Sequence, residues 1–195
     1  NRETVSFSDN SKLTLEEFLC HSEEEVDSTA VGSYLHGKTV LVTGAGGSIG
    51  SELCRHIIRC HPGHLLLLGK GEHSIYQIRN ELQFLAADQK ITSIIGDVCH
   101  AGKMDYVFRT YRPDIVFHTA AYKHVIFVEQ NPEEGVRNNI FGTHNVAQIA
   151  RQYQAEKFVL ISTDKAVQAT SVYGATKKMA ELLVQELASE GPTNF

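Results

Sequence analysis

The segment Thr43-Gly44-Ala45-Gly46-Gly47-Ser48-Ile49-Gly50 constrains the fold more than any other feature of this chain. It follows the apolar run Thr39–Val42 and precedes an amphipathic stretch that predicts a helix from about Ser48 to Cys60. Glycines here let the chain turn sharply, let the backbone approach a pyrophosphate and let the helix pack closely on the strand. The helix N-terminus then offers N–H groups and a partial positive charge to phosphates. The alternative is a plain glycine-rich loop, but the strand–turn–helix context favours dinucleotide binding.

Short apolar runs alternate with longer amphipathic stretches from Gly37 onward. The runs show little polar alternation, as parallel strands covered on both faces do. Strands are expected at Thr39–Val42, Leu65–Leu68, Ile91–Ile95, Ile115–Phe117 and Phe158–Ile161. Further helices are expected at Ser74–Ala86, at Pro132–Gln154 and at about Tyr173–Ala188. Such alternation forms βαβ units, so the sequence predicts an α/β fold with a doubly wound parallel sheet, the Rossmann fold.

Two regions are expected along the chain. Residues 1–36 are rich in Ser, Glu and Asp and are interpreted as a linker or leader, in which Leu13–Leu19 could form a short helix. Residues 37–195 are interpreted as an NAD(P)-binding domain. A crossover helix normally leads to another parallel strand, and no apolar run follows the last expected helix. The domain is therefore expected to stop before its last strands and before any sugar-binding lobe.

The composition argues against several classes of function. The chain has 195 residues, of which 42% are hydrophobic, and a formal net charge of −5, so neither nucleic acid nor an anionic membrane is expected as a partner. No run approaches the roughly 18 apolar residues that cross a bilayer. The four cysteines and ten histidines show no metal-ligand spacing. Reduced thiols, no metal site and a cytoplasmic location are therefore expected.

The end of the second expected strand bears on the choice between NAD and NADP. It reads Gly69-Lys70-Gly71-Glu72, without an acidic residue at the strand tip to hold the ribose of NAD. Lys70 could pair with a 2′-phosphate, which favours NADP. In the alternative, Lys70 is a solvated loop residue and Glu72 binds the ribose. After the third strand, Asp97 and Val98 are expected near the adenine, unless Asp97 only caps the next turn.

A second group of polar residues follows the fifth expected strand. Ser162-Thr163-Asp164-Lys165 stands where that strand ends, and ligands of open α/β sheets bind beyond the carboxyl ends of the strands. Tyr173 and Lys177 come next, four residues apart on one helix face. A lysine so placed can stabilise a tyrosinate and lower a tyrosine pKa that is otherwise about 10. Such pairs are common on exposed helices, but after this strand end and the glycine-rich turn the pair indicates catalysis.

These motifs together resemble the extended short-chain dehydrogenase/reductase family. Within it, the sequence is similar to the UDP-N-acetylglucosamine 4,6-dehydratases and capsular polysaccharide biosynthesis proteins of polysaccharide and flagellar glycan synthesis. The similarity covers about residues 37–188. Besides the glycine-rich turn, it rests on His118-Thr119-Ala120-Ala121-Tyr122-Lys123-His124-Val125, on Asn139-Ile140-Phe141-Gly142-Thr143 and on Ser162-Thr163-Asp164-Lys165-Ala166-Val167.

The resemblance implies tightly bound NADP, with NAD as the less favoured cofactor, and a UDP-sugar substrate. Lys123 follows the fourth expected strand and is expected to contact the substrate or, alternatively, the cofactor. The resemblance also implies a homo-oligomer and, in the long members, a membrane anchor before this domain, here upstream of residue 1, which would make this the cytoplasmic domain of an inner-membrane protein. Together with the residue patterns, it assigns cofactor contacts to Thr43, Gly44, Gly46, Gly47, Ser48, Ile49, Gly50, Lys70, Asp97, Val98, Ala120, Ala121, Tyr122, Asn139, Tyr173 and Lys177.

The reaction that the resemblance implies has three steps. Tyr173, with Lys177 beside it, would take the proton of the sugar 4-hydroxyl as hydride leaves C4 for NADP⁺, and Thr163 would hydrogen-bond that oxygen. Lys165 would remove the C5 proton, which requires a lowered lysine pKa, and Asp164 would protonate the departing 6-hydroxyl, which requires a raised carboxyl pKa. Hydride would then return to C6. Many long members have Met in place of Tyr173, so the tyrosine here supports activity.

Other interpretations stay open. A nucleotide-sugar 4-epimerase would use the same tyrosine, lysine and threonine without the Asp164–Lys165 pair, which could then be a salt-linked strand end. A non-catalytic domain in which NADP controls assembly is a second alternative. Without a sugar-binding lobe, this chain alone is not expected to turn over substrate. His118 and Asn139 are expected to be buried structural residues and not to transfer protons.

Overall fold

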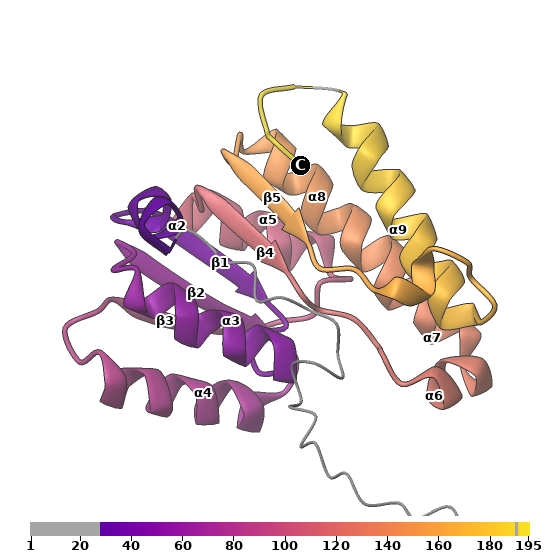
Figure 1. The fold of residues 1–195 in the computed structure, drawn as a ribbon, viewed down its shortest axis with the longest axis horizontal. Coiled ribbons are helices and arrows are strands. Elements are labelled where there is room, and N and C mark those ends of the chain that lie inside the picture. The colour runs from indigo at the N-terminus through magenta and orange to yellow at the C-terminus, as the bar shows by residue number, and fades with distance from the viewer. Residues whose placement is uncertain (1–27, 190) are drawn as a thin grey trace, which may run out of the picture.

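Five parallel strands form the central sheet of the molecule. The computed structural model describes residues 28–189 and 191–195. The strands are β1 (Thr39–Thr43), β2 (His64–Gly69), β3 (Ile91–Ile95), β4 (Ile115–His118) and β5 (Lys157–Leu160), in the spatial order β3-β2-β1-β4-β5 (Figure 1). Each neighbouring pair is parallel. The predicted α/β fold with a doubly wound parallel sheet is therefore confirmed.

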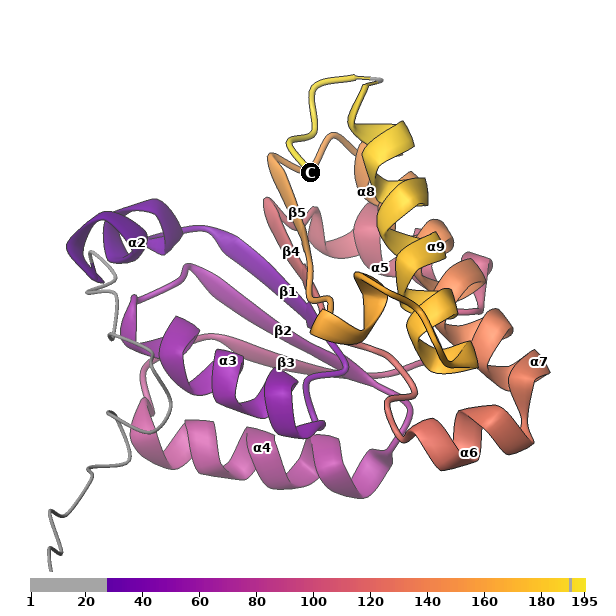
Figure 2. The same cartoon turned by 45° about the vertical axis from the view of Figure 1, so that its right-hand side comes forward.

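Helices cover both faces of this sheet (Figures 1 and 2). One face carries α3 (Ser48–Arg59) and α4 (Glu72–Leu85), and the other carries α5 (Ala101–Tyr111), α8 (Thr143–Gln152) and α9 (Val172–Ala188). The chain enters β1 through α2 (Ser28–Leu35) and connects β4 to α8 through α6 (Val125–Gln130), α7 (Pro132–Gly135) and the π-helical turn η1 (Val136–Gly142). In the described part of the chain, no helix has the length and apolar character needed to span a membrane.

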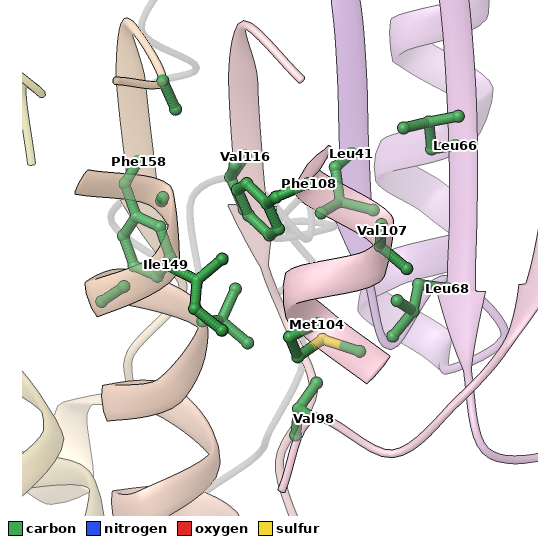
Figure 3. Close-up of a cluster of buried hydrophobic side chains, with 14 of the residues drawn as sticks. Leu41, Leu66, Leu68, Val98, Met104, Val107, Phe108, Val116, Ile149 and Phe158 are labelled. Atoms are coloured by element: carbon green, nitrogen blue, oxygen red, sulfur yellow. The ribbon is translucent and has the colours of Figure 1, made fainter. Parts of the chain in front are cut away.

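Successive strand residues enter two hydrophobic clusters, one on each face of the sheet. In β1, Leu41 belongs to the cluster that faces α5, whereas Val40 and Val42 belong to the cluster that faces α3 and α4. Figure 3 shows the first cluster, in which Phe108 and Met104 of α5 lie against strand residues. All residues of β2 are buried. This burial explains why the strand appears in the sequence as a continuous apolar run without polar alternation.

The helix predicted at Pro132–Gln154 is confirmed as one helical segment that ends at Gln152, but it is not a regular α-helix throughout. It comprises the four-residue α7, the π-helical turn η1 and α8, which follow one another directly. Single π-helical turns inside α-helices are uncommon and are often found at functional sites. Here the hydroxyl of Thr143 donates to the backbone carbonyl of Asn139 at 2.7 Å.

Three of the α-helices within the described residues were not predicted from the sequence. They are α5, α6 and α2, and α2 begins at Ser28 inside the region interpreted as a linker. The short helix predicted at Leu13–Leu19 lies outside the described residues.

The last described residues pair with β5. The Phe158 backbone N–H donates to the Asn194 carbonyl at 2.8 Å, and the Asn194 N–H donates to the Glu156 carbonyl at 3.0 Å. Asn194 thereby forms a parallel bridge with Lys157. Parallel pairing thus does follow α9, although residues 191–195 contain no apolar run that would predict it.

Candidate active site

The glycine-rich turn and the segment after β4 meet at the carboxyl ends of the two central strands. β1 lies between β2 and β4, so the strand order reverses here, and ligands of open α/β sheets bind at this switch point. The Thr119 hydroxyl donates to the Thr43 carbonyl at 2.7 Å and ties the two segments together. Gly44 has a φ of 70°, and a Cβ on it would lie 2.7 Å from the Ala120 nitrogen. This approach therefore requires glycine.

The start of α3 is arranged as an anion cradle. A Cβ on Gly50 would meet the carbonyl oxygen of Gly44, so glycine also lets α3 begin directly beside the turn. Gly47 is the N-cap residue, and no side chain caps the helix. The first N–H groups of α3 lack partners within the helix and carry the positive end of its dipole. These features fit a pyrophosphate group.

A cavity of about 240 Å³ opens at the same point. Half of the residues predicted to bind the cofactor line it, namely Gly44, Gly46, Gly47, Lys70, Val98, Ala120, Ala121 and Tyr122. The other predicted residues do not: Thr43, Ser48, Ile49, Gly50, Asp97, Asn139, Tyr173 and Lys177. The lining also includes Ser74, Thr119 and Asn138, which the sequence did not single out for cofactor contact. The cradle and the cavity together fit the pyrophosphate and the adjoining part of a dinucleotide.

Lys70 is a paired cation at the rim of this cavity and not a free surface lysine. Its Nζ donates to the Tyr122 hydroxyl at 3.1 Å and lies 3.3 Å from Asp97 Oδ2. Burial lowers the pKa of Lys70, but the Tyr122 hydroxyl and the Asp97 charge outweigh it and raise that pKa overall. Asp97 also accepts from the Cys99 N–H at 2.8 Å and lies 3.3 Å from Arg137. Asp97 therefore stabilises the turn that follows β3, which was the alternative to a contact with the adenine, and it also pairs with Lys70.

The predicted substrate residue Lys123 lies next to the glycine-rich turn. Its Nζ donates to the Ser48 hydroxyl at 2.6 Å, so the segment after β4 is also tied to the first residue of α3. Lys123 lines a second cavity of about 280 Å³, together with Phe127 of α6 and Gly135 of α7. This cavity adjoins the first one through Tyr122, which lines both.

Thr163, Asp164 and Lys165 lie in a tight turn after β5. The strand ends at Leu160, and the 3₁₀ turn η2 spans Asp164–Ala166. Asp164 Oδ1 accepts from the Thr163 hydroxyl at 2.9 Å and from Lys165 Nζ at 3.4 Å. The Thr163 hydrogen bond first, and then the lysine, hold the pKa of Asp164 below its usual value. Because the backbone turns here, these adjacent side chains meet, which they would not do in a continuing strand.

Tyr173 and Lys177 are buried on α9, with 7% and 4% of their surfaces exposed. The helix start is fixed by Ser171, whose hydroxyl accepts from the Gly174 N–H at 3.0 Å, and by Glu129, which accepts from the Val172 N–H at 2.6 Å. A Cβ on Gly174 would meet the Lys165 carbonyl oxygen, so the first turn of α9 packs directly on η2. The backbone of Lys165 therefore lies beside the start of the helix that carries Tyr173 and Lys177.

Lys177 is held in place by the segment between β5 and η2. Its Nζ donates to the Ile161 carbonyl at 2.7 Å. Burial lowers the pKa of Lys177 to about 8, and the Glu181 charge opposes this shift in part. Below this pKa the side chain is a cation, and it is the cation that can stabilise a nearby tyrosinate.

This lowered pKa predicts how stability depends on pH. Between its folded pKa of about 8 and its unfolded value of 10.5, Lys177 binds more protons in the unfolded chain, so it makes the protein more stable as pH rises. The free energy of unfolding of the parent, relative to that of Lys177→Met, should rise by about 2 kcal/mol between pH 7 and pH 9.5. Urea unfolding at both pH values measures the difference. A constant difference would mean that Lys177 titrates normally.

His118 and Asn139 are buried and hydrogen-bonded within the protein, as expected for structural residues. Burial lowers the pKa of His118 to about 3, and the Lys177 charge adds to this shift. The imidazole is therefore neutral at physiological pH.

Comparison with known proteins shows the family to which the chain belongs. Residues 40–195 match a family described as "Polysaccharide biosynthesis protein". "Capsular polysaccharide biosynthesis protein CapD" of Staphylococcus aureus is 45% identical over 177 residues, which are 90% of this chain and 30% of that protein. "UDP-N-acetylglucosamine 4,6-dehydratase (inverting)" of Campylobacter jejuni is 30% identical over 164 residues, 82% of this chain and 47% of that protein.

A solved structure shows the same fold with a similar degree of identity. The X-ray structure of Pen from Bacillus thuringiensis superimposes with a TM-score of 0.75 at 32% identity, and the match covers 83% of this chain and 49% of that one. The chain thus spans about a third of the length of CapD and about half the length of the other two proteins.

Proposed function

Because the chain belongs to the polysaccharide biosynthesis protein family, we propose that it forms the cofactor-binding part of a nucleotide-sugar 4,6-dehydratase that acts on UDP-N-acetylglucosamine. The observation that carries this proposal is the packing of η2 on the first turn of α9. In this packing the Lys165 backbone contacts Gly174, the residue after Tyr173. The proposal gives the Asp164–Lys165 pair, which only a dehydratase needs, a role in one site with the Tyr173–Lys177 pair, which a dehydratase and an epimerase would both use. The C. jejuni relative is named for this reaction.

We propose NADP as the cofactor, with NAD as the less favoured choice. Bound cofactor would supply reversible hydride transfer. Gly44, Gly46 and Gly47 would hold its pyrophosphate through backbone contacts. Among the described residues that line the cavity, Lys70 is the one with a charged side chain. Glu72, the first residue of α4, does not line it. A 2′-phosphate would find its cationic partner in Lys70.

The residues of the turn and the helix would divide the proton transfers among them. Tyr173, supported by the Lys177 charge, would accept the proton of the sugar 4-hydroxyl while Thr163 holds that oxygen. The resulting 4-ketone acidifies the C5–H bond, and Lys165 would take that proton. Asp164 would give its proton to the 6-hydroxyl, which leaves as water. Since Asp164 is exposed and has a lowered pKa, this role requires the bound sugar to cover it, because burial raises a carboxyl pKa.

The proposed function is tested with the whole protein, including any sequence that continues beyond residue 195. UDP-N-acetylglucosamine and a catalytic amount of NADP⁺ are supplied in deuterated water, and the product is weighed by mass spectrometry. We expect a product that has lost one water and gained deuterium from the solvent.

Two results would contradict the proposal. A product of unchanged mass with an inverted C4 centre would identify a 4-epimerase. Absence of any product despite bound cofactor would favour a different sugar or a regulatory domain.

A further inference from the structure

A series of buried hydrogen bonds runs from β1 through β4 to α8, on one face of the sheet. It joins Thr43, the last residue of β1, to His118, the last residue of β4, and then to Thr143, the first residue of α8. Thr43 Oγ1 lies 2.7 Å from His118 Nδ1, and His118 Nε2 lies 3.0 Å from Thr143 Oγ1. Thr143 Oγ1 in turn donates to the Asn139 carbonyl at 2.7 Å. All four residues are less than 4% exposed.

The direction of these hydrogen bonds follows from their last member. A carbonyl only accepts, so the single hydroxyl hydrogen of Thr143 points to Asn139, and Thr143 can only accept from His118. His118 Nε2 therefore carries the proton. A neutral imidazole has one N–H group, so Nδ1 accepts, and the Thr43 hydroxyl donates to it. The tautomer of His118 is fixed by its partners.

This series of hydrogen bonds ends at Asn139 in the π-helical turn η1. The side chain of Asn139 bonds the backbone of a residue that lines the cavity. Asn139 Oδ1 accepts from the Tyr122 N–H at 2.8 Å, and its Nδ2 donates to the Tyr122 carbonyl at 3.0 Å. The same Nδ2 lies 3.1 Å from Thr176 Oγ1 on α9. Asn139 thus satisfies both backbone groups of Tyr122, which lines the cavity and bonds Lys70.

We propose that His118 and Thr143 are positioning residues for the cofactor site, because their hydrogen bonds fix the Asn139 carbonyl in η1 and thereby hold the Asn139 carboxamide on the backbone of Tyr122. The inference depends on the proposed function at one point only, namely that the cavity lined by Tyr122 binds a nicotinamide cofactor. Neither side chain lines the cavity, so both act through Asn139.

The first test replaces Thr143 with valine, which keeps the side-chain shape and removes the hydroxyl, and with serine, which keeps the hydroxyl. Amide hydrogen exchange is followed by NMR at the Tyr122 N–H, with the Leu66 N–H in β2 as the reference for global opening. Thr143→Val should speed exchange at Tyr122 about tenfold and leave Leu66 within about twofold, because the carboxamide loses its fixed support. Thr143→Ser should leave both amides within about twofold of the parent.

The second test separates the two halves of the chain of hydrogen bonds. His118→Gln keeps an N–H group at the position of Nε2 and so preserves the bond to Thr143, whereas His118→Asn keeps an acceptor near the position of Nδ1 and preserves only the bond to Thr43. The dissociation constant for NADP⁺, measured by calorimetry, should rise about tenfold in His118→Asn and clearly less in His118→Gln, because only the Thr143 half reaches Asn139.

Several results would overturn the inference. The first is an unchanged exchange rate at Tyr122 in Thr143→Val. The second is an equal acceleration of exchange at Tyr122 and Leu66 in that variant. The third is an acceleration at Tyr122 in Thr143→Ser as large as that in Thr143→Val. A larger rise in the dissociation constant for His118→Gln than for His118→Asn would also overturn it. If the parent protein binds no nicotinamide cofactor, the proposed function fails, but the exchange measurement still decides whether the two residues position Tyr122.

Discussion

Replacing Tyr173 with phenylalanine should lower the rate of 4-keto sugar formation by about 10²- to 10⁴-fold. The substitution removes the phenol that would accept the proton of the sugar 4-hydroxyl, and it leaves the buried ring in place. The rate is measured by mass spectrometry of the product at saturating UDP-N-acetylglucosamine. Since the ring stays in its packing site, the thermal midpoint should change little.

Tyr153 offers a matched control for this variant. Its hydroxyl donates to Asp105 at 2.7 Å, next to the end of α8 and outside both cavities described above. Tyr153→Phe removes an equivalent hydroxyl, and we expect the dehydration rate to stay at the parent value. If Tyr173→Phe also retained the parent rate, Tyr173 could not be the base for the 4-hydroxyl, and the proposed division of roles would fail.

The sheet could be predicted from the sequence because its strands are buried on both faces. The run Leu65–Leu68 has no polar interruption, and in the structure every residue of β2 is buried. The glycine-rich turn could be predicted as well, since Gly44 and Gly50 meet the backbone of neighbouring segments so closely that other residues would not fit. Local sequence therefore determines these elements.

The π-helical segment within Pro132–Gln154 depends on contacts that the local sequence does not show. The π turn is supported by Thr143 on the Asn139 carbonyl and by Asn139 on Tyr122, a residue of another segment. Helical periodicity carries no sign of such a support. By contrast, α5 could have been predicted, because Met104, Val107 and Phe108 lie on one helix face at the spacing of an amphipathic helix.

In the candidate site, too, the local sequence predicts the positions of the residues but not the contacts between them. The motifs place Lys70, Asp97 and Tyr122 after three different strands, and the strand order brings those strand ends together. That Lys70 pairs with both of the others, and that Lys123 reaches Ser48, depends on side-chain geometry across the switch point. Sequence reasoning could therefore name these residues one by one but could not pair them.

Separate replacements in η2 should distinguish a dehydratase from an epimerase. Lys165→Met removes the base at C5, so both the uptake of solvent deuterium at C5 and the loss of water should fall by about 10²- to 10⁴-fold. Asp164→Asn removes only the acid for the 6-hydroxyl, so C5 exchange should continue while water loss falls by a similar factor. Mass spectrometry of the sugar in deuterated water measures both quantities in one sample.

The exposed pair Lys38–Glu156 provides the control, because it has the same charges at 2.6 Å but lies before β1 and β5, at the opposite edge of the sheet. Lys38→Met and Glu156→Gln should leave C5 exchange and water loss unchanged, since exposed ion pairs contribute little to stability. If both η2 variants kept their full rate of sugar conversion and the product were an isomer, the Asp164–Lys165 pair would be a salt-linked turn. The same Tyr173–Lys177 pair would then serve a 4-epimerase, because inversion at C4 needs no acid or base at C5 and C6.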